Sequence, residues 1–233
     1  LLRRLEAAKP AELRETRNLP RDAARAAMDA AREQPAAVGI IVNRVATARA
    51  IHAELIQAQA EPHSRKWSIP EDVPLELVIG SMRPIDRDQQ TARLAELVGP
   101  ERPAVTARTS FIIATQCLEV GADYDFDVLI TECASLDALR QRFGRLNRAG
   151  RAIDSRAVIF TEAKNIKPEE KLDDEKPLDP IYGNALARTW HWLTEHATET
   201  LIDEEPRKVV DFGIDAFNAL IKEHGEADRP PMN

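Results

Sequence analysis

Short apolar runs alternate with helical patterns from residue 20 to residue 161, and this alternation is the feature that most constrains the fold. Strands are expected where apolar and β-branched residues run together, at 38–42, 75–79, 110–114, 128–131 and 157–160. Helices are expected between them, at 20–33, 45–58, 84–98 and from the N-cap residue Ser135 onwards. Strands that alternate with helices form parallel sheets, so the sequence predicts an α/β fold with helices on both faces of the sheet.

The run from Gln141 to Arg148 holds three arginines and one glycine in eight residues. Numbered as a helix, it puts Gln141, Arg145 and Arg148 on one face. The opposite face would dock on the core and carries Leu136, Leu139, Phe143 and Leu146. A guanidinium is planar, always charged and suited to phosphate oxygens. A solvated basic face would give the same pattern. However, a glycine inside a helix costs about 0.5–1 kcal/mol and usually marks a close approach or a helix end.

The segment before this helix narrows the interpretation. Ala114-Thr115 is followed by Gly121-Ala122-Asp123 in the loop between two predicted strands. This loop resembles motif V of the second RecA-like domain of superfamily 2 helicases, and Gln141 to Arg148 resembles motif VI, Q-R-x-G-R-x-x-R. Together the two motifs are most similar to the CRISPR-associated helicase–nuclease of type I systems, over residues 20–160. The implied fold is a RecA-like parallel sheet.

The resemblance also implies roles for five residues. Arg145 and Arg148 would be arginine fingers that reach the γ-phosphate of ATP, and Gln141 would bind near the phosphates or the attacking water. Gly121 would allow close backbone approach to the nucleotide, and Asp123 would accept a hydrogen bond from a ribose hydroxyl. Without the motif, Asp123 would be read as an ordinary turn residue.

Polar residues that follow the predicted strands are candidates for a nucleic-acid track. They are Asn43, Arg44, Ser81, Arg83 and Thr115. Residues 38–43 resemble motif IV, and residues 78–87 resemble the next segment of the family. The carboxyl ends of parallel strands meet at one edge of a sheet, where ligands usually bind. Contacts to backbone phosphates there would give little sequence preference and a strong salt dependence.

The sequence supplies only part of an ATP-driven motor. It has no G-x-x-x-x-G-K-[S/T] loop and no strand that ends in Asp-Glu-x-His or Asp-Glu-x-Asp, the elements that hold phosphate and magnesium. We therefore expect a fragment that does not hydrolyse ATP alone. ATP and Mg²⁺ would be held mainly by a first RecA-like domain of the parent chain. Arg140 and Arg142 lie off the predicted finger face and are expected to matter less.

Charge and composition suggest four segments. The formal net charge is −7, and residues 161–233 carry 17 acidic and 9 basic side chains, so the acidity lies in the C-terminal part. We expect an N-terminal connector at 1–19, a RecA-like helicase C-terminal domain at 20–161, an acidic linker at 162–180 and a small helical appendage at 181–233. The tryptophans of this appendage, Trp190 and Trp192, are expected in a core or an interface.

Two isolated cysteines, Cys117 and Cys133, fit small core residues in a reducing cytoplasm. The sequence has no metal-ligand spacing, and no apolar run approaches the ~20 residues of a membrane span. A cytoplasmic protein without a membrane partner is expected.

The leading hypothesis is the second motor domain of an ATP-dependent DNA helicase of type I CRISPR interference. Its partners would be single-stranded DNA, the first RecA-like domain of the same chain and the CRISPR effector complex. Two alternatives remain open at this point. One is the same domain in another superfamily 2 enzyme, such as a restriction-type translocase or an RNA helicase. The other is a RecA-like binding module without catalysis.

Overall fold

The fold is taken from a computed structural model of the 233-residue chain. The structure describes residues 2–32, 34–60, 68–80, 84–99, 102–103, 106–118 and 123–224.

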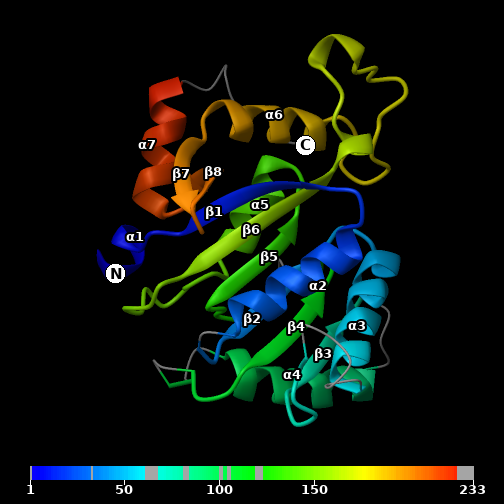
Figure 1. Ribbon diagram of the computed structural model, residues 1–233, viewed down its shortest axis with the longest axis vertical. Coiled ribbons are helices and arrows are strands. Elements are labelled where there is room, and N and C mark those ends of the chain that lie inside the picture. Colours follow the sequence, from blue (N-terminus) through cyan, green and yellow to red (C-terminus); the bar gives the residue numbers. More distant parts are fainter. Residues whose placement is uncertain are drawn as a thin grey trace.

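An eight-stranded sheet forms the centre of the molecule, with strand order β3-β4-β2-β5-β6-β1-β8-β7 (Figure 1). Its strands are β1 (Pro10–Thr16), β2 (Ala37–Ile41), β3 (Leu75–Val78), β4 (Ser110–Ala114), β5 (Val128–Glu132), β6 (Arg156–Glu162), β7 (Thr198–Ile202) and β8 (Glu205–Asp211). The strands from β3 to β1 in this order are parallel, whereas β8 pairs antiparallel with β1 and β7 pairs antiparallel with β8. The predicted parallel α/β sheet is confirmed.

Helices cover both faces of this sheet (Figure 1). The α-helices are α1 (Leu2–Glu6), α2 (Leu19–Ala30), α3 (Val45–Ala60), α4 (Pro84–Val98), α5 (Leu136–Phe143), α6 (Ala185–Glu195) and α7 (Ile214–His224). Short 3₁₀ helices occur at η1 (Gln116–Leu118), η2 (Ala163–Asn165) and η3 (Glu169–Lys171). The expected helices are therefore present, with bounds that differ by up to three residues in α2, α3 and α4, whereas α5 ends earlier than expected.

Alternate residues of the central strands pack on opposite faces, as the twofold period of a strand requires. Val38 and Ile40 of β2 pack in one cluster with α2 and α3. Ala37 of the same strand packs with Leu94 and Val98 of α4, and Ile41 packs in a further cluster with α5, α6 and α7. Because both faces are covered, β2, β4 and β5 are buried at every position.

The structure corrects the expectation for both ends of the chain. Residues 1–19, expected as a connector, contain β1, which lies between β6 and β8. Residues 181–233, expected to be helical, contain the β7–β8 hairpin, whose turn residues Asp203 and Glu204 both have positive φ. The strands β1 and β7 have no apolar run. Charged residues recur along β1, and β7 is largely exposed.

The described residues also show no break in the core at position 161. One hydrophobic cluster contains Leu13 of β1, Ile159 of β6 and Leu139 of α5, together with Trp190 of α6 and Phe217 of α7. Trp190 and Trp192 are both buried, as expected for core residues. The C-terminal part therefore completes the sheet and covers one of its faces.

Candidate functional site

The helix α5 is shorter than the sequence pattern predicts. Ser135 is its N-cap, as expected, and accepts a hydrogen bond from the backbone N–H of Ala138 at 3.4 Å. The helix ends at Phe143, and Gly144 is the C-cap residue. Helical numbering therefore does not apply to Arg145 and Arg148, and the prediction that they share one helix face with Gln141 is wrong. Gln141 remains on the helix and is exposed.

The turn after Gly144 is held against the amino end of β5. The backbone N–H of Phe126 donates to the carbonyl of Arg145 at 2.8 Å, and the N–H of Asn147 donates to the carbonyl of Phe126 at 2.8 Å. Asp125 accepts the backbone N–H of Arg148 at 2.8 Å. Leu146 is fully buried, so the turn is anchored both by hydrogen bonds and by packing.

Asp123, Arg145 and Arg148 form a cluster at this end of the sheet, which we call the arginine cluster. Arg148 pairs with Asp123 through its Nε, and its side chain is 35% exposed. Arg145 is largely buried, and burial together with the neighbouring positive charge of Arg148 lowers its pKa. The cluster has two guanidiniums and one carboxylate. Both arginines stand on a turn that hydrogen bonds fix, and the partly exposed Arg148 is suited to an anion.

A second group of polar side chains lies at the opposite, carboxyl end of the strands. Its centre is Arg142, whose side chain is fully buried. Its guanidinium donates to Thr131 Oγ1 at 3.0 Å, to the Glu132 carbonyl at 2.9 Å, to Asn43 Oδ1 at 3.0 Å and to the Tyr182 hydroxyl at 3.1 Å.

The neighbours of Arg142 extend this group to the loops that follow β2 and β4. Arg44 Nη2 pairs with Asp179 Oδ2 at 2.7 Å, and Gln116 Nε2 donates to the Tyr182 hydroxyl at 2.9 Å. We call the whole set the carboxyl-end network. It comprises Asn43, Arg44, Gln116, Thr131, Glu132, Arg142, Asp179 and Tyr182.

Arg142 lies off the predicted finger face but is fully buried in the carboxyl-end network, and the expectation that it matters less for ATP turnover stays a prediction. Side chains on a helix lean toward its N-terminus. Arg142 therefore reaches back from the last turn of α5 to the end of the sheet where the helix begins. Sequence numbering gives the face of a helix but not the length of this reach. The signal that could have revealed it is that Arg142 follows Ala138 and Leu139, two buried residues of α5, at helical spacing.

The predicted nucleic-acid residues differ in how far they are available. Asn43 is buried, donates to the Cys133 carbonyl at 2.9 Å and accepts from Arg142, so its side chain supports the network rather than facing solvent. The Arg44 side chain is 40% exposed. Thr115 is nearly buried at the end of β4. Ser81, Arg83 and the predicted nucleotide contact Gly121 lie outside the described residues.

The two groups are separated by the length of β5. This strand has five residues, which corresponds to about 17 Å between its ends. Thr115 follows β4 at the carboxyl end of the sheet, whereas Asp123 precedes β5 at the amino end. The motif V segment thus begins at one end of the sheet and finishes at the other.

The cysteines and possible metal ligands add little to the site. Cys133 is fully buried, which raises its pKa to about 12, but Cys117 is exposed, so the expectation of a core residue is wrong there.

Among the described residues, no group of three or more His, Cys, Asp or Glu side chains could hold a metal ion. No helix in the described part of the chain is long and apolar enough to cross a membrane.

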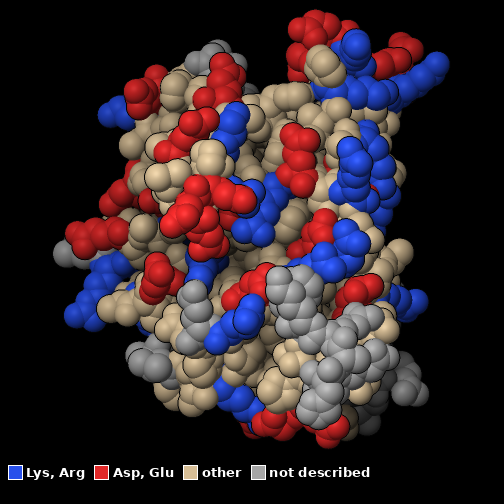
Figure 2. Space-filling model, in the orientation of Figure 1, with Lys and Arg blue, Asp and Glu red and all other residues tan. Residues whose placement is uncertain are grey.

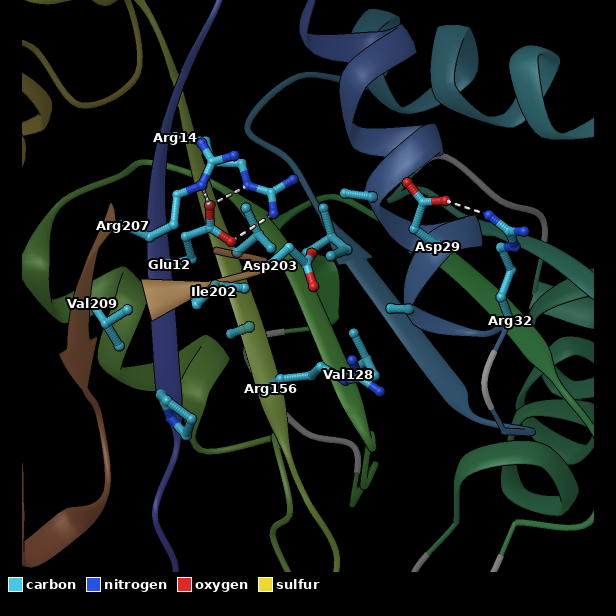
Figure 3. A pocket seen from close by; sticks show the side chains of 16 residues that line it. Glu12, Arg14, Asp29, Arg32, Val128, Arg156, Ile202, Asp203, Arg207 and Val209 are labelled. Atoms are coloured by element: carbon cyan, nitrogen blue, oxygen red, sulfur yellow. Dashed lines mark hydrogen bonds and ion pairs between the residues drawn. The ribbon is translucent and has the colours of Figure 1, made fainter. Parts of the chain in front are cut away.

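A groove of about 830 Å³ lies away from both groups, on the part of the sheet that α2 leaves uncovered (Figure 3). Glu12 on its floor forms ion pairs with Arg14 at 2.6 Å and Arg207 at 3.4 Å. Asp29 and Arg32 of the α2 segment pair at 3.7 Å on the other side. Acidic and basic side chains are interspersed over this face of the molecule (Figure 2). The groove is therefore not a single-sign binding surface.

The parallel sheet, with a motif V-like segment spanning its two ends and an arginine turn after α5, defines a RecA-like helicase C-terminal domain. Residues 34–151, about half of the chain, match the family model described as "CRISPR-associated nuclease/helicase Cas3, C-terminal". The chain belongs to this family.

Several relatives and solved structures resemble the chain. The "CRISPR-associated nuclease/helicase Cas3" of Streptococcus thermophilus is 30% identical over 162 residues, which cover 68% of this chain and 16% of the relative. The "CRISPR-associated endonuclease/helicase Cas3" of Thermus thermophilus is 36% identical over 99 residues, 41% of this chain and 10% of the relative. The structure of T. fusca Cas3-AMPPNP has a TM-score of 0.65 at 20% identity, over 95% of this chain and 25% of that one. The chain thus spans a quarter or less of the length of each.

Proposed function

We propose that this chain is the second motor domain of an ATP-dependent DNA helicase of superfamily 2 that acts in type I CRISPR interference. Membership of the Cas3-like C-terminal family supports this proposal. The observation that carries it is the arginine cluster: two arginines on one anchored turn beside Asp123, with the Arg148 side chain partly exposed. A binding module that does not act on phosphates would not need two arginines anchored in this way.

Arg145 and Arg148 fit the role of arginine fingers. The positive charge of Arg148 disfavours that of Arg145, and a γ-phosphate of ATP would relieve this repulsion. Bound ATP with Mg²⁺ supplies the phosphoryl group and its charge neutralisation. In the parent protein both would be held mainly by a first RecA-like domain, since this sequence has no phosphate loop. Asp123 would release Arg148 toward the phosphate when it accepts a ribose hydroxyl, and Gln141 and Gly121 would contribute as the motifs imply.

The carboxyl end of the sheet fits a track for single-stranded DNA. Arg44 is partly exposed there, and Thr115 stands at the end of β4 with its backbone N–H 3.4 Å from the Val78 carbonyl. Ser81 and Arg83 remain candidates on the neighbouring segment. We propose that Asn43 acts indirectly, by orienting Arg142 behind the track.

The wider partners follow from the same assignment. A solved structure that resembles the chain with a TM-score of 0.59 is titled "CRISPR RNA-guided surveillance complex, pre-nicking". We propose that the parent protein acts with such an effector complex in the cytoplasm, where the two unpaired cysteines would stay reduced.

Phosphate release by the parent protein tests the proposal. With single-stranded DNA present, Arg145→Ala or Arg148→Ala should lower turnover by at least ~10³, the usual size of an arginine-finger effect. Arg140→Ala is the matched control, because Arg140 is an exposed arginine of the preceding helix α5, and it should stay within a few-fold of wild type. The 233-residue chain alone should release no phosphate. Finger variants with near-normal turnover would refute the assignment.

A further inference from the structure

A short turn from Asp179 to Gly183 contributes Asp179 and Tyr182 to the carboxyl-end network. In sequence, this turn lies after the segment that matches the family model. The Asp179 side chain is fully buried, and its Oδ1 accepts the backbone N–H groups of Ile181 at 2.9 Å and Tyr182 at 2.8 Å. The N–H of Gly183 donates to the Asp179 carbonyl at 2.9 Å. These bonds fix the position of Tyr182 relative to Asp179.

The turn holds three separate parts of the domain together. The Tyr182 hydroxyl accepts from Gln116, which follows Thr115 after β4, and from Arg142 of α5. Asp179 Oδ2 holds Arg44, which follows β2. Both loops of the proposed DNA track are thereby bonded to one turn.

Arg142 connects this arrangement to the other end of the sheet. Its guanidinium lies in the carboxyl-end network, and its backbone carbonyl accepts the N–H of Arg145 at 2.9 Å. A shift of the track loops that moved Tyr182 would therefore also move Arg142, to which the turn that carries Arg145 is hydrogen-bonded. Such a continuous chain of hydrogen bonds is a physical means of coupling two sites, provided that both sites bias it.

We propose that Tyr182, held by Asp179, is a positioning residue that couples DNA binding on the track to the placement of Arg145 and Arg148. This inference rests on the proposed function. It assigns no contact with DNA or nucleotide to Tyr182. Its hydroxyl sets the relation between the loops after β2 and β4 and helix α5.

The test compares Tyr182→Phe with wild type in the full-length parent protein, with a single-stranded oligothymidylate as the activating DNA. The ratio of DNA-stimulated to DNA-free ATPase should fall about fivefold or more, because two hydrogen bonds to the track loop and to Arg142 are lost. The DNA concentration for half-maximal stimulation should rise. A purely structural role would lower both rates in proportion to the folded fraction and leave their ratio unchanged.

Two further variants sharpen the comparison. Tyr124→Phe removes the hydroxyl of the other tyrosine in the chain, which lies near Cys117 and Arg145 and outside the Asp179–Gly183 turn, and should leave the DNA requirement unchanged. Asp179→Asn keeps an oxygen for the turn but loses the charge that holds Arg44, and should reproduce the lower ratio of Tyr182→Phe. If Tyr182→Phe and Asp179→Asn both kept the wild-type ratio of DNA-stimulated to DNA-free ATPase, this inference would be overturned but the proposed function would not. A wild-type parent that DNA does not stimulate would instead overturn the proposed function.

Discussion

The two ends of β5 carry arginines in opposite circumstances. At the carboxyl end, Arg142 is fully buried and makes four hydrogen bonds to fixed partners. At the amino end, Arg148 is partly exposed and pairs with Asp123, a carboxylate that is itself more than half exposed. A buried, fully bonded arginine holds structure in place, whereas an exposed pair can exchange partners at small cost. The same motif thus supplies one arginine that holds structure in place and others that we propose bind a ligand.

The spacing of Arg142 and Arg145 in the segment from Gln141 to Arg148 places two neighbouring arginines at different ends of the sheet. Arg142 and Arg145 are joined by a backbone hydrogen bond of 2.9 Å, yet their side chains serve opposite ends of the sheet. The short helix α5 and the turn after Gly144 make this possible, because the helix ends one residue after Arg142 and its side chain leans back toward the helix N-terminus. A longer helix would have carried the arginine turn away from Phe126 and β5.

The largest expected effect comes from removing everything after Thr161. This truncation deletes the partners of Arg142 and Arg44 in the 179–182 turn and strips α6, β8 and α7 from one hydrophobic cluster. We expect residues 1–161 to lose the cooperative thermal transition that the whole chain shows, as followed by circular dichroism. The sequence alone suggests instead a domain that folds without the C-terminal part. A cooperative transition in the truncated chain would restore that boundary.

Arg142→Met should have the next largest effect, on stability. It leaves Asn43 Oδ1 and the Glu132 carbonyl without their buried donor, which typically costs about 1–3 kcal/mol for each unsatisfied group. Urea denaturation of the 233-residue chain measures this free energy of unfolding. Arg140→Met, on the exposed side of the same helix, is the control and should change it by about 0.5 kcal/mol or less. Equal effects of the two variants would show that the buried network does not support the fold.

The smallest expected effects distinguish the ends of β5 by pH. Burial raises the pKa of Glu132 above its ordinary 4.5. Its contribution to stability is therefore complete below that pH and is lost as the pH rises through the raised pKa. Burial also acts to raise the pKa of Asp127, but hydrogen bonds from Arg102, the Ala37 N–H and Thr106 outweigh it and hold the pKa below the ordinary 3.8. The contribution of Asp127 is present above that pH and is lost on acidification.

Unfolding free energies measured across the acidic and neutral range check these two signs. Glu132→Gln should flatten the decline of stability above pH 4.5, and Asp127→Asn should flatten the decline below pH 3.8. Each variant serves as the control for the other. If both variants flattened the same part of the stability–pH curve, the opposite pKa shifts assigned to the two carboxylates would be contradicted.

The sequence predicted those parts of the fold whose residues are buried on both sides. The run at 110–114 could be read directly as β4, because every position is apolar or small and buried. The strands β1 and β7 could not, since their pairing comes from distant partners while their own residues alternate with charge or face solvent. Arg145 and Arg148 could be selected as candidates from the motif. The role of Arg142, and of Tyr182 from outside the motif, depends on side-chain reach that no linear pattern contains.

The central claim is that the amino end of the sheet serves hydrolysis and the carboxyl end serves the DNA track. The most direct test measures both quantities in the parent protein for Arg148→Ala and Arg44→Ala, namely ATP turnover at saturating single-stranded DNA and the Kd for that DNA. We predict a crossed result. Arg148→Ala should lose about 10³ in turnover with little change in Kd, and Arg44→Ala should weaken DNA binding about 10-fold with turnover nearly retained. A result in which both variants change the same quantity would contradict the separation of the two ends.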